Sequence, residues 1–175
     1  MAVRPLPRTI SALTISLTLA SILGAQTVPA PTTQSKKEVR VTALAKGSFE
    51  VTLVPLAEGN RKGVWTPGRM SIDKRFHGDL EGSSQGEMLT AMTEVQGSAG
   101  YTAIERVQGT LQGRKGSFIL QHFALMARGV PGEWTVQIVP DSGTEDLKGI
   151  SGRMRITITG KEHGYALEYL LPAAP

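Results

Sequence analysis

The sequence predicts an all-β, antiparallel fold, and three observations lead to this class. Apolar and polar residues alternate with period two through most of the chain, which is typical of strands with one buried face. The 20 glycines separate the alternating runs, as the turns between short strands require. Beyond the N-terminal apolar segment, no run of the sequence shows the roughly 3.6-residue periodicity of an amphipathic helix.

Eight segments carry the alternation and are the expected strands: residues 46–56, 69–77, 87–93, 101–112, 117–125, 134–139, 150–159 and 165–170. Eight short strands with turn signals between them indicate a sandwich or a closed barrel. Closure is favoured because it leaves no edge strand exposed to pairing with another chain. The folded part is expected to be a single domain, residues 41–172.

The N-terminus, residues 1–25, is expected to be a signal peptide. Arg4 and Arg8 supply the positive start, residues 10–24 form an apolar stretch, and Ala25 is a small residue suited to a cleavage site. The apolar stretch is short for a transmembrane helix and has no stop-transfer flank, so cleavage is favoured over anchoring. We therefore expect an exported protein, periplasmic or extracellular, with no stable membrane insertion after cleavage.

Composition narrows the classes of partner and chemistry. Residues 26–40 are rich in Pro, Thr and Gln without apolar periodicity, which predicts a disordered linker. The chain has no cysteine, which excludes disulfides, thiolate catalysis and cysteine-ligated zinc. Loss of Arg4 and Arg8 with the signal peptide lowers the formal charge from +4 to +2. Because the remaining basic residues are scattered and aromatic residues make up 5% of the chain, no nucleic-acid partner is expected.

The segment 97–122 is the most informative, because two alternating runs flank the glycine-bounded stretch GRKG. We place the hairpin turn at residues 113–116. The opposed pairs are then Leu111 with Phe118, Gly109 with Leu120, and Val107 with His122. The more apolar face is the expected interior and consists of Tyr101, Ala103, Glu105, Val107, Leu111, Phe118, Leu120, His122 and Ala124.

Glu105 and His122 are ionisable residues on that face, and this register makes them diagonal neighbours. A buried carboxylate is costly unless it is paired or hydrogen-bonded. The pair is suited to general acid–base chemistry or to holding the polar end of an apolar ligand. A structural pair with Tyr101 as third partner is the alternative interpretation. The candidate ligand-binding residues are Tyr101, Glu105, His122, Phe118, Leu120 and Trp134.

Other polar groups give weaker signals. Asp79 and Glu81, within HGDLEG, indicate a polar turn, with cation binding as the alternative, and Arg106 lies on the opposite face of the hairpin. These three residues are secondary site candidates. The loop 140–149 and His163 are expected at the surface. The sequence has no Walker loop, zinc signature or nucleophile elbow, so no metal or cofactor is predicted.

Four segments resemble those of one bacterial family: SIDKRFHGDLEG, GSAGYTAIERVQGTLQGRKGSFILQH, WTVQIVPDSGTEDLKGISG and HGYALEYLL. In order and spacing they are similar to the family of domain of unknown function 3224, DUF3224, from about Lys46 to Leu170. The resemblance implies an eight-stranded antiparallel closed barrel like that of allene oxide cyclase, a calycin-like cup with an internal cavity. It implies no established activity. The chain differs from the expected pattern in having PDSGT instead of PGSGT, and in its N-terminal signal and linker.

A barrel of this size either fills itself with side chains or holds one small ligand. Three functions follow from this, in order of preference. The first is a carrier or sensor of a small, largely apolar molecule. The second is a cofactor-free isomerase or cyclase, and the third is a filled barrel that acts through surface or oligomeric contacts. Because a fold does not determine a function, the sequence leaves open whether the protein is an enzyme and whether it forms a homodimer.

Overall fold

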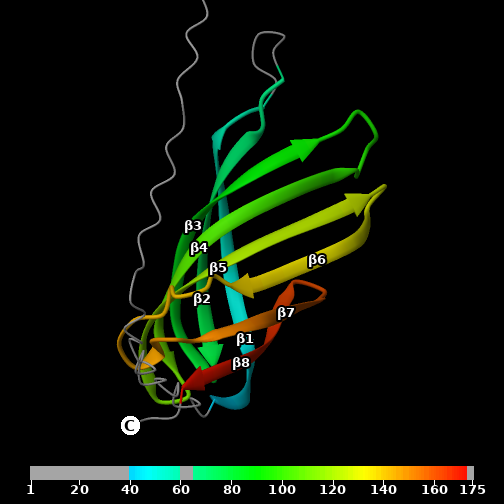
Figure 1. The fold of residues 1–175 in the computed structure, drawn as a ribbon. Coiled ribbons are helices and arrows are strands. Elements are labelled where there is room, and N and C mark those ends of the chain that lie inside the picture. Colours follow the sequence, from blue (N-terminus) through cyan, green and yellow to red (C-terminus); the bar gives the residue numbers. More distant parts are fainter. Residues whose placement is uncertain (1–39, 60–64, 173–175) are drawn as a thin grey trace, which may run out of the picture. The chain divides into compact units, whose positions relative to one another are not determined.

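The computed structural model describes residues 40–59 and 65–172, which form a closed antiparallel β-barrel (Figure 1). Each strand pairs with its neighbours in the chain, and the last strand pairs with the first. The strands are β1 (Arg40–Ala57), β2 (Gly68–Gly78), β3 (Leu80–Met92), β4 (Ala99–Leu111), β5 (Arg114–Ala127), β6 (Val130–Ile138), β7 (Ser151–Thr159) and β8 (Glu162–Pro172). A short 3₁₀ helix, η2 (Glu145–Leu147), lies between β6 and β7. The predicted all-β class, the eight strands and the closure of the barrel are confirmed.

Two predictions concern residues beyond this description. The expected signal peptide, residues 1–25, lies outside the described residues, and so does the expected linker up to residue 39. Arg40, the last residue of that expected linker, is the first residue of β1, where its backbone is paired with Pro172. Within the described part of the chain, no helix is long and apolar enough to cross a membrane.

Strand β3 begins at Leu80, well before the predicted start of this strand. The first half of β3 was not predicted as a strand because it contains Gly82 and Gly86, and glycine is depleted in strands. The connection from β2 is a single residue, Asp79. The backbone N–H of Asp79 donates to the Lys46 carbonyl at 3.0 Å, and its carboxylate accepts from the Lys46 N–H at 2.8 Å. The polar segment predicted as a turn is therefore mostly strand.

The turn between β4 and β5 differs from the predicted one. Gln112 and Gly113 form a two-residue loop with Leu111 opposite Arg114. Both loop residues have positive φ, 47° and 83°, as a type I′ hairpin turn requires. The predicted turn at 113–116 is therefore wrong, because it assigned the turn to the glycine-bounded stretch rather than to the pair that adopts the left-handed conformation.

The observed register changes the partners of the hairpin residues but not their faces. The opposed pairs are Val107 with Phe118, Glu105 with Leu120, Ala103 with His122, and Gly109 with Gly116. Because the register differs from the predicted one by an even number of residues, the inward face is the predicted one. Glu105 and His122 remain diagonal neighbours, although across the other diagonal.

One half of the barrel is filled by packed side chains. Its core consists of Ala45, Phe49, Phe76, Leu80, Val107, Leu111, Phe118, Leu120, Val136, Ile138, Leu147, Ile150, Met154, Tyr165, Leu167, Tyr169 and Leu171. Leu147, from η2, is 1% exposed, so the predicted surface loop 140–149 contributes to the core. Gly116 makes room for this loop, because a β-carbon there would meet the Thr144 carbonyl and the Leu147 side chain.

In the other half, the pairing of the barrel wall is less complete. The pairing of β1 with β8 ends where Phe49 lies opposite His163, whereas β1 continues along β2 to Ala57. Strands β6 and β7 pair at Gln137 opposite Arg153. Among the described residues, this single pair closes the wall between β6 and β7 in the filled half, and the pairing is interrupted between β6 and β1 in this open half.

Candidate functional site

Polar side chains from four adjacent strands meet inside the barrel. Lys74 of β2, Ser84 of β3, Glu105 of β4 and His122 of β5 are all buried, and Tyr101 of β4 adjoins them. We call these five residues the polar cluster. Each lies on the inward face of its strand, because side chains alternate between the two faces and these residues share the buried alternation of their strand.

Glu105 is the centre of the polar cluster. Its carboxylate is 0% exposed and lies 2.5 Å from the Lys74 ammonium, through Oε1, while Ser84 Oγ donates to Oε2 at 2.7 Å. Gly86, the cross-strand partner of Glu105, leaves the space that this arrangement needs, because a β-carbon at Gly86 would meet the Ile104 carbonyl and Cα and Cβ of Glu105. The carboxylate therefore has the pairing that burial of a charge demands.

His122 is only loosely held by its neighbours. Its Nε2 lies 3.5 Å from Glu105 Oε1 and its Nδ1 lies 3.5 Å from the Tyr101 hydroxyl, both long for hydrogen bonds. Nε2 is buried without a hydrogen-bond partner among the described residues. Burial and the positive charge of Lys74 lower the pKa of the imidazole to about 4, against the opposing effect of Glu105. The ring is therefore neutral at neutral pH.

Tyr101 contributes a phenol hydroxyl to the cluster, on the side of His122. Its ring stands edge-on to the His122 ring, with centroids 5.7 Å apart. Burial and the negative charge of Glu105 raise the pKa of the phenol to about 12, against a hydrogen bond with Trp134 that lowers it. The phenol is therefore protonated at neutral pH and can act as a hydrogen-bond donor.

A pocket of about 200 Å³ lies in the open half of the barrel against the polar cluster. It is lined by Phe49, Val51, Leu53, Ile72, Lys74, Met88, Tyr101, His122, Trp134, Ile156 and His163. Leu53 and Trp134 are 44% and 38% exposed, so this pocket reaches solvent on their side. The pocket is an apolar recess, and the polar groups of Lys74, Tyr101 and His122 lie together on one side of it.

The structure brings together most of the predicted site residues. Glu105, His122 and Tyr101 form part of one cluster, and Trp134 lines the pocket beside them. Phe118 and Leu120 point inward as predicted, but they belong to the packed core and not to the pocket lining. His163, which we expected at the surface, is half-buried and lines the pocket.

The secondary candidates have local structural contacts. Glu81 accepts a hydrogen bond from the Gly78 N–H at 2.8 Å, and Asp79 accepts from Lys46. Arg106 donates to Ser117 Oγ at 3.0 Å. None of the three side chains lines the pocket. Among the described residues, no group of three or more His, Asp or Glu side chains is arranged to hold a metal ion.

Sequence reasoning missed Lys74 and Ser84. A signal for Lys74 was present, because it follows the same period as Ile72 and Phe76, both of which are buried. Its charge hid the alternation, since lysine is rarely fully buried unless it is paired. Ser84 was missed because the strand that holds it was predicted to start later.

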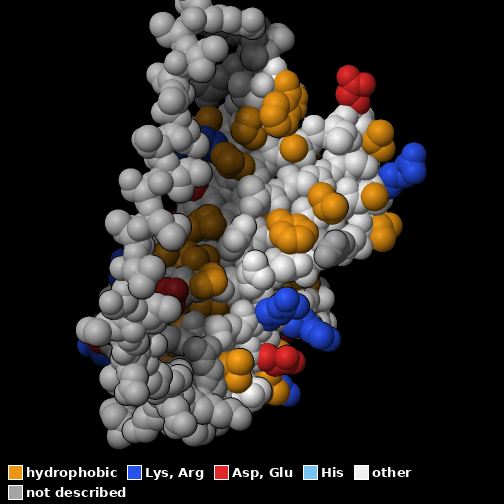
Figure 2. Space-filling model, viewed as in Figure 1, with side chains coloured by type: hydrophobic (Ala, Val, Ile, Leu, Met, Phe, Trp, Pro, Cys, Tyr) orange, Lys and Arg blue, Asp and Glu red, His pale blue; other side chains and the backbone are white. Residues whose placement is uncertain are grey.

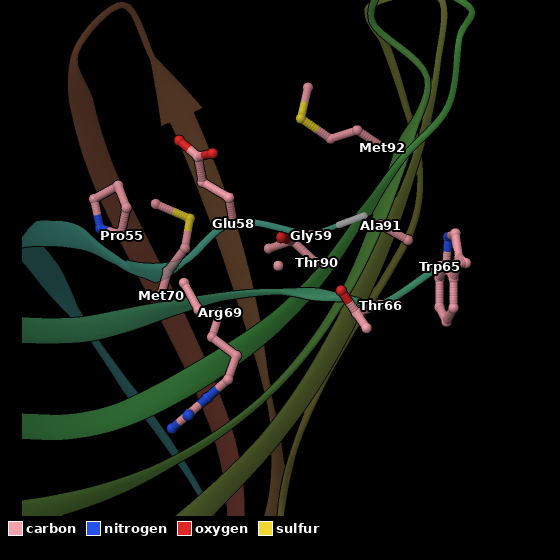
Figure 3. Close-up of a pocket in the computed structure, with 12 residues that line it drawn as sticks. Pro55, Glu58, Gly59, Trp65, Thr66, Arg69, Met70, Thr90, Ala91 and Met92 are labelled. Carbon is pink, nitrogen blue, oxygen red and sulfur yellow. The ribbon is translucent and has the colours of Figure 1, made fainter. Parts of the chain in front are cut away.

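A second pocket of about 360 Å³ lies near the start of β2 and the end of β3 (Figure 3). Pro55, Met70 and Met92 give it an apolar character, whereas the Arg69 side chain extends away from Met70 in Figure 3 and pairs with Glu87 at 2.6 Å. None of its lining residues belongs to the polar cluster. This second pocket is therefore the weaker candidate.

The fold and the site define a class: a closed eight-stranded β-barrel, filled in one half, with a pocket beside a buried ion pair in the other. The chain belongs to the DUF3224 family, because the family model described as "Protein of unknown function (DUF3224)" matches residues 45–169. The predicted family is thereby confirmed.

One solved structure supports this assignment. The chain is similar to a protein with unknown function from the DUF3224 family of Shewanella oneidensis MR-1, whose crystal structure is known. The two share 45% sequence identity, and the match covers 77% of this chain and 100% of that one, with a TM-score of 0.68. No curated protein matches the sequence.

Proposed function

We propose that the protein binds a small, largely apolar molecule in the pocket of the open half of the barrel. The observation that carries this proposal is a recess with mostly apolar walls that also exposes Lys74, Tyr101 and His122 to its contents. Ligand sites commonly combine apolar walls with a few convergent polar groups. A volume of about 200 Å³ suits a molecule somewhat larger than benzene, which fills a cavity of about 150 Å³.

The energetics of the polar cluster support a role beyond packing. Replacing a buried ion pair by apolar side chains of similar volume is often neutral or stabilising by about 1–4 kcal/mol. The filled half of this barrel shows that the fold packs well with apolar side chains such as Phe118 and Leu120. The pair between Lys74 and Glu105 is therefore better explained by what it does in the pocket than by stability alone.

The outer surface offers a weaker basis for a function. Figure 2 shows hydrophobic side chains at several places on the visible face, among white and charged atoms. Ile104, Phe123 and Leu125 form a short exposed row on β4 and β5, because Phe123 lies diagonally across from Ile104 and two residues before Leu125. A row of this few side chains is within what monomeric proteins commonly expose, so it is a weaker basis for a function than the pocket.

A blocking substitution tests the proposal. We expect methylcyclohexane and toluene to shift the NMR resonances of the Ile72 and Met88 methyl groups, which line the pocket. Ile156→Trp should abolish these shifts by filling the pocket, whereas Ile104→Trp, at a 51% exposed position on β4, should preserve them. The proposal fails if neither probe shifts these methyl groups, or if both variants respond alike.

We also propose that this binding takes place outside the cytoplasm, as the basic and apolar residues 1–25 indicate. Cell fractionation followed by N-terminal sequencing tests this. A processed form beginning near Gln26 in the exported fraction is expected. An unprocessed cytoplasmic form would overturn the proposed location without affecting the binding proposal.

A further inference from the structure

The hydrogen-bonding capacity of Lys74 is only partly used within the protein. An ammonium group has three N–H donors and no acceptor. Among the described residues, Nζ donates to Glu105 and lies 5.1 Å from the centre of the Phe49 ring, a cation–π contact. Lys74 and Phe49 both line the pocket, so this ammonium borders the space that a ligand would fill. A donor therefore remains for an acceptor atom in the pocket.

The polar side of the pocket carries no net charge. The Lys74 ammonium is paired with the Glu105 carboxylate, and the buried His122 ring contributes no charge when neutral. A ligand carboxylate near Lys74 would be repelled by the Glu105 carboxylate that is paired with the same ammonium, and a ligand ammonium would be repelled by Lys74 itself. Either ion would lose its hydration without gaining an unpaired counter-charge, which is costly in an apolar recess.

We infer that the ligand carries an uncharged hydrogen-bond acceptor, such as a carbonyl oxygen, which binds the Lys74 ammonium while its apolar body contacts Val51, Ile72 and Met88. The Tyr101 hydroxyl is the second donor on this side of the pocket, because its long contact of 3.5 Å with His122 is easily exchanged for a shorter one. This inference rests on the proposed function and adds the chemical class of the ligand.

Four probes that share one six-membered ring test the inference: cyclohexanone, methylcyclohexane, cyclohexanecarboxylate and cyclohexylammonium. Binding to the full chain is measured by NMR titration of the Ile72 and Met88 methyl groups at neutral pH. We expect cyclohexanone to bind at least about tenfold more tightly than methylcyclohexane, because a hydrogen bond to a charged donor has an effect of that size. The two ions should bind more weakly than cyclohexanone.

A double substitution shows whether Lys74 is responsible. Lys74→Met combined with Glu105→Gln removes both charges together, so no unpaired charge is left inside the barrel. In this variant cyclohexanone should lose its advantage over methylcyclohexane, so that the ratio of the two affinities falls toward one. Lys115→Met removes an exposed lysine on β5 and should leave the affinities for all four probes unchanged. Circular dichroism confirms that each variant is folded.

The outcomes separate this inference from the proposed function. If methylcyclohexane binds as tightly as cyclohexanone, or if either ion binds more tightly, the inferred ligand class is overturned while binding in the pocket stands. If the double variant keeps the full preference for cyclohexanone, the role of Lys74 is overturned. If none of the four probes shifts the pocket methyl groups, the proposed function fails as well.

Discussion

The Lys74 Nζ atom and the Glu105 Oε1 atom lie 2.5 Å apart inside the barrel, and the two side chains are 3% and 0% exposed. They come from β2 and β4, two strands that β3 separates. Ser84 of β3 completes the link by donating to the other carboxylate oxygen at 2.7 Å. The ion pair therefore ties three strands together across the interior, next to the pocket.

Removing one partner of this pair should destabilise the protein strongly. Lys74→Met leaves the Glu105 carboxylate buried without its cation, and breaking a buried pair in this way costs about 3–5 kcal/mol. Urea unfolding followed by circular dichroism measures the loss. The double variant Lys74→Met/Glu105→Gln should be destabilised much less than Lys74→Met alone, because it leaves no unpaired charge.

The exposed pair between Arg69 of β2 and Glu87 of β3 is the control, because it also links two strands but lies in water. Arg69→Met should change the free energy of unfolding by at most about 1 kcal/mol. If Lys74→Met costs no more than Arg69→Met, the buried pair has no special role in stability.

The stability of the barrel should fall as the pH drops from about 6.5 to about 4. Burial and the Lys74 charge hold the pKa of His122 at about 4, although Glu105 favours its protonation, whereas the unfolded chain protonates this imidazole near 6.5. Between these values the unfolded state binds more protons than the folded state. The contribution of His122 to the free energy of unfolding is therefore greatest above about pH 6.5. About 3 kcal/mol of it is lost by pH 4.

The comparison that isolates His122 is with His122→Phe. The variant lacks the titrating group, so the difference in unfolding free energy between it and the natural chain should vary with pH in this window. Urea unfolding at a series of pH values measures this difference. Ile104→Phe, at a 51% exposed position with no titrating side chain, should reproduce the natural pH dependence. A difference that is constant from pH 4 to 7 would contradict the prediction for His122.

Much of the site was predictable because strand alternation places side chains by period alone. Glu105, His122 and Tyr101 were found in this way, and they face inward as predicted although the predicted register was wrong. Faces depend only on whether a shift is even or odd, so they are more secure than partners. Diagonal contact between Glu105 and His122 survived for the same reason.

The position of the turn and the depth of each side chain along the barrel could not be predicted from the alternation of apolar and polar residues. The true turn was missed because Gln112 adopts positive φ, which its residue type does not suggest. Phe118 and the pocket-lining Trp134 share the inward direction, but depth along the barrel decides that one fills the core and the other meets the pocket. Depth follows from how the strands are staggered, and the sequence shows that stagger only through its turns.

Gly86 should be required for the position of Glu105. In Gly86→Ala the added β-carbon meets the Ile104 carbonyl and the Glu105 backbone, neither of which yields easily, so we expect a loss of about 1–3 kcal/mol. Gly100→Ala is the control, because its nearest neighbour is the flexible end of the Leu125 side chain at 3.1 Å. Urea unfolding of both variants tests this, and equal losses would show that Gly86 has no special steric role.

Gln112 should stabilise the β4–β5 turn through its side chain, in spite of its backbone. Its φ of 47° favours glycine, and relief of this strain is worth roughly 1 kcal/mol. Against this, Nε2 donates to the Leu44 carbonyl at 3.1 Å and Oε1 accepts from the Tyr169 hydroxyl at 2.7 Å. Two such bonds contribute about 1 kcal/mol each, and their loss leaves the Tyr169 hydroxyl without this acceptor. Gln112→Gly should therefore destabilise the protein by about 1 kcal/mol in urea unfolding. The loss should be smaller when Tyr169→Phe is already present. A Gln112→Gly variant more stable than the natural chain would show that the backbone strain dominates.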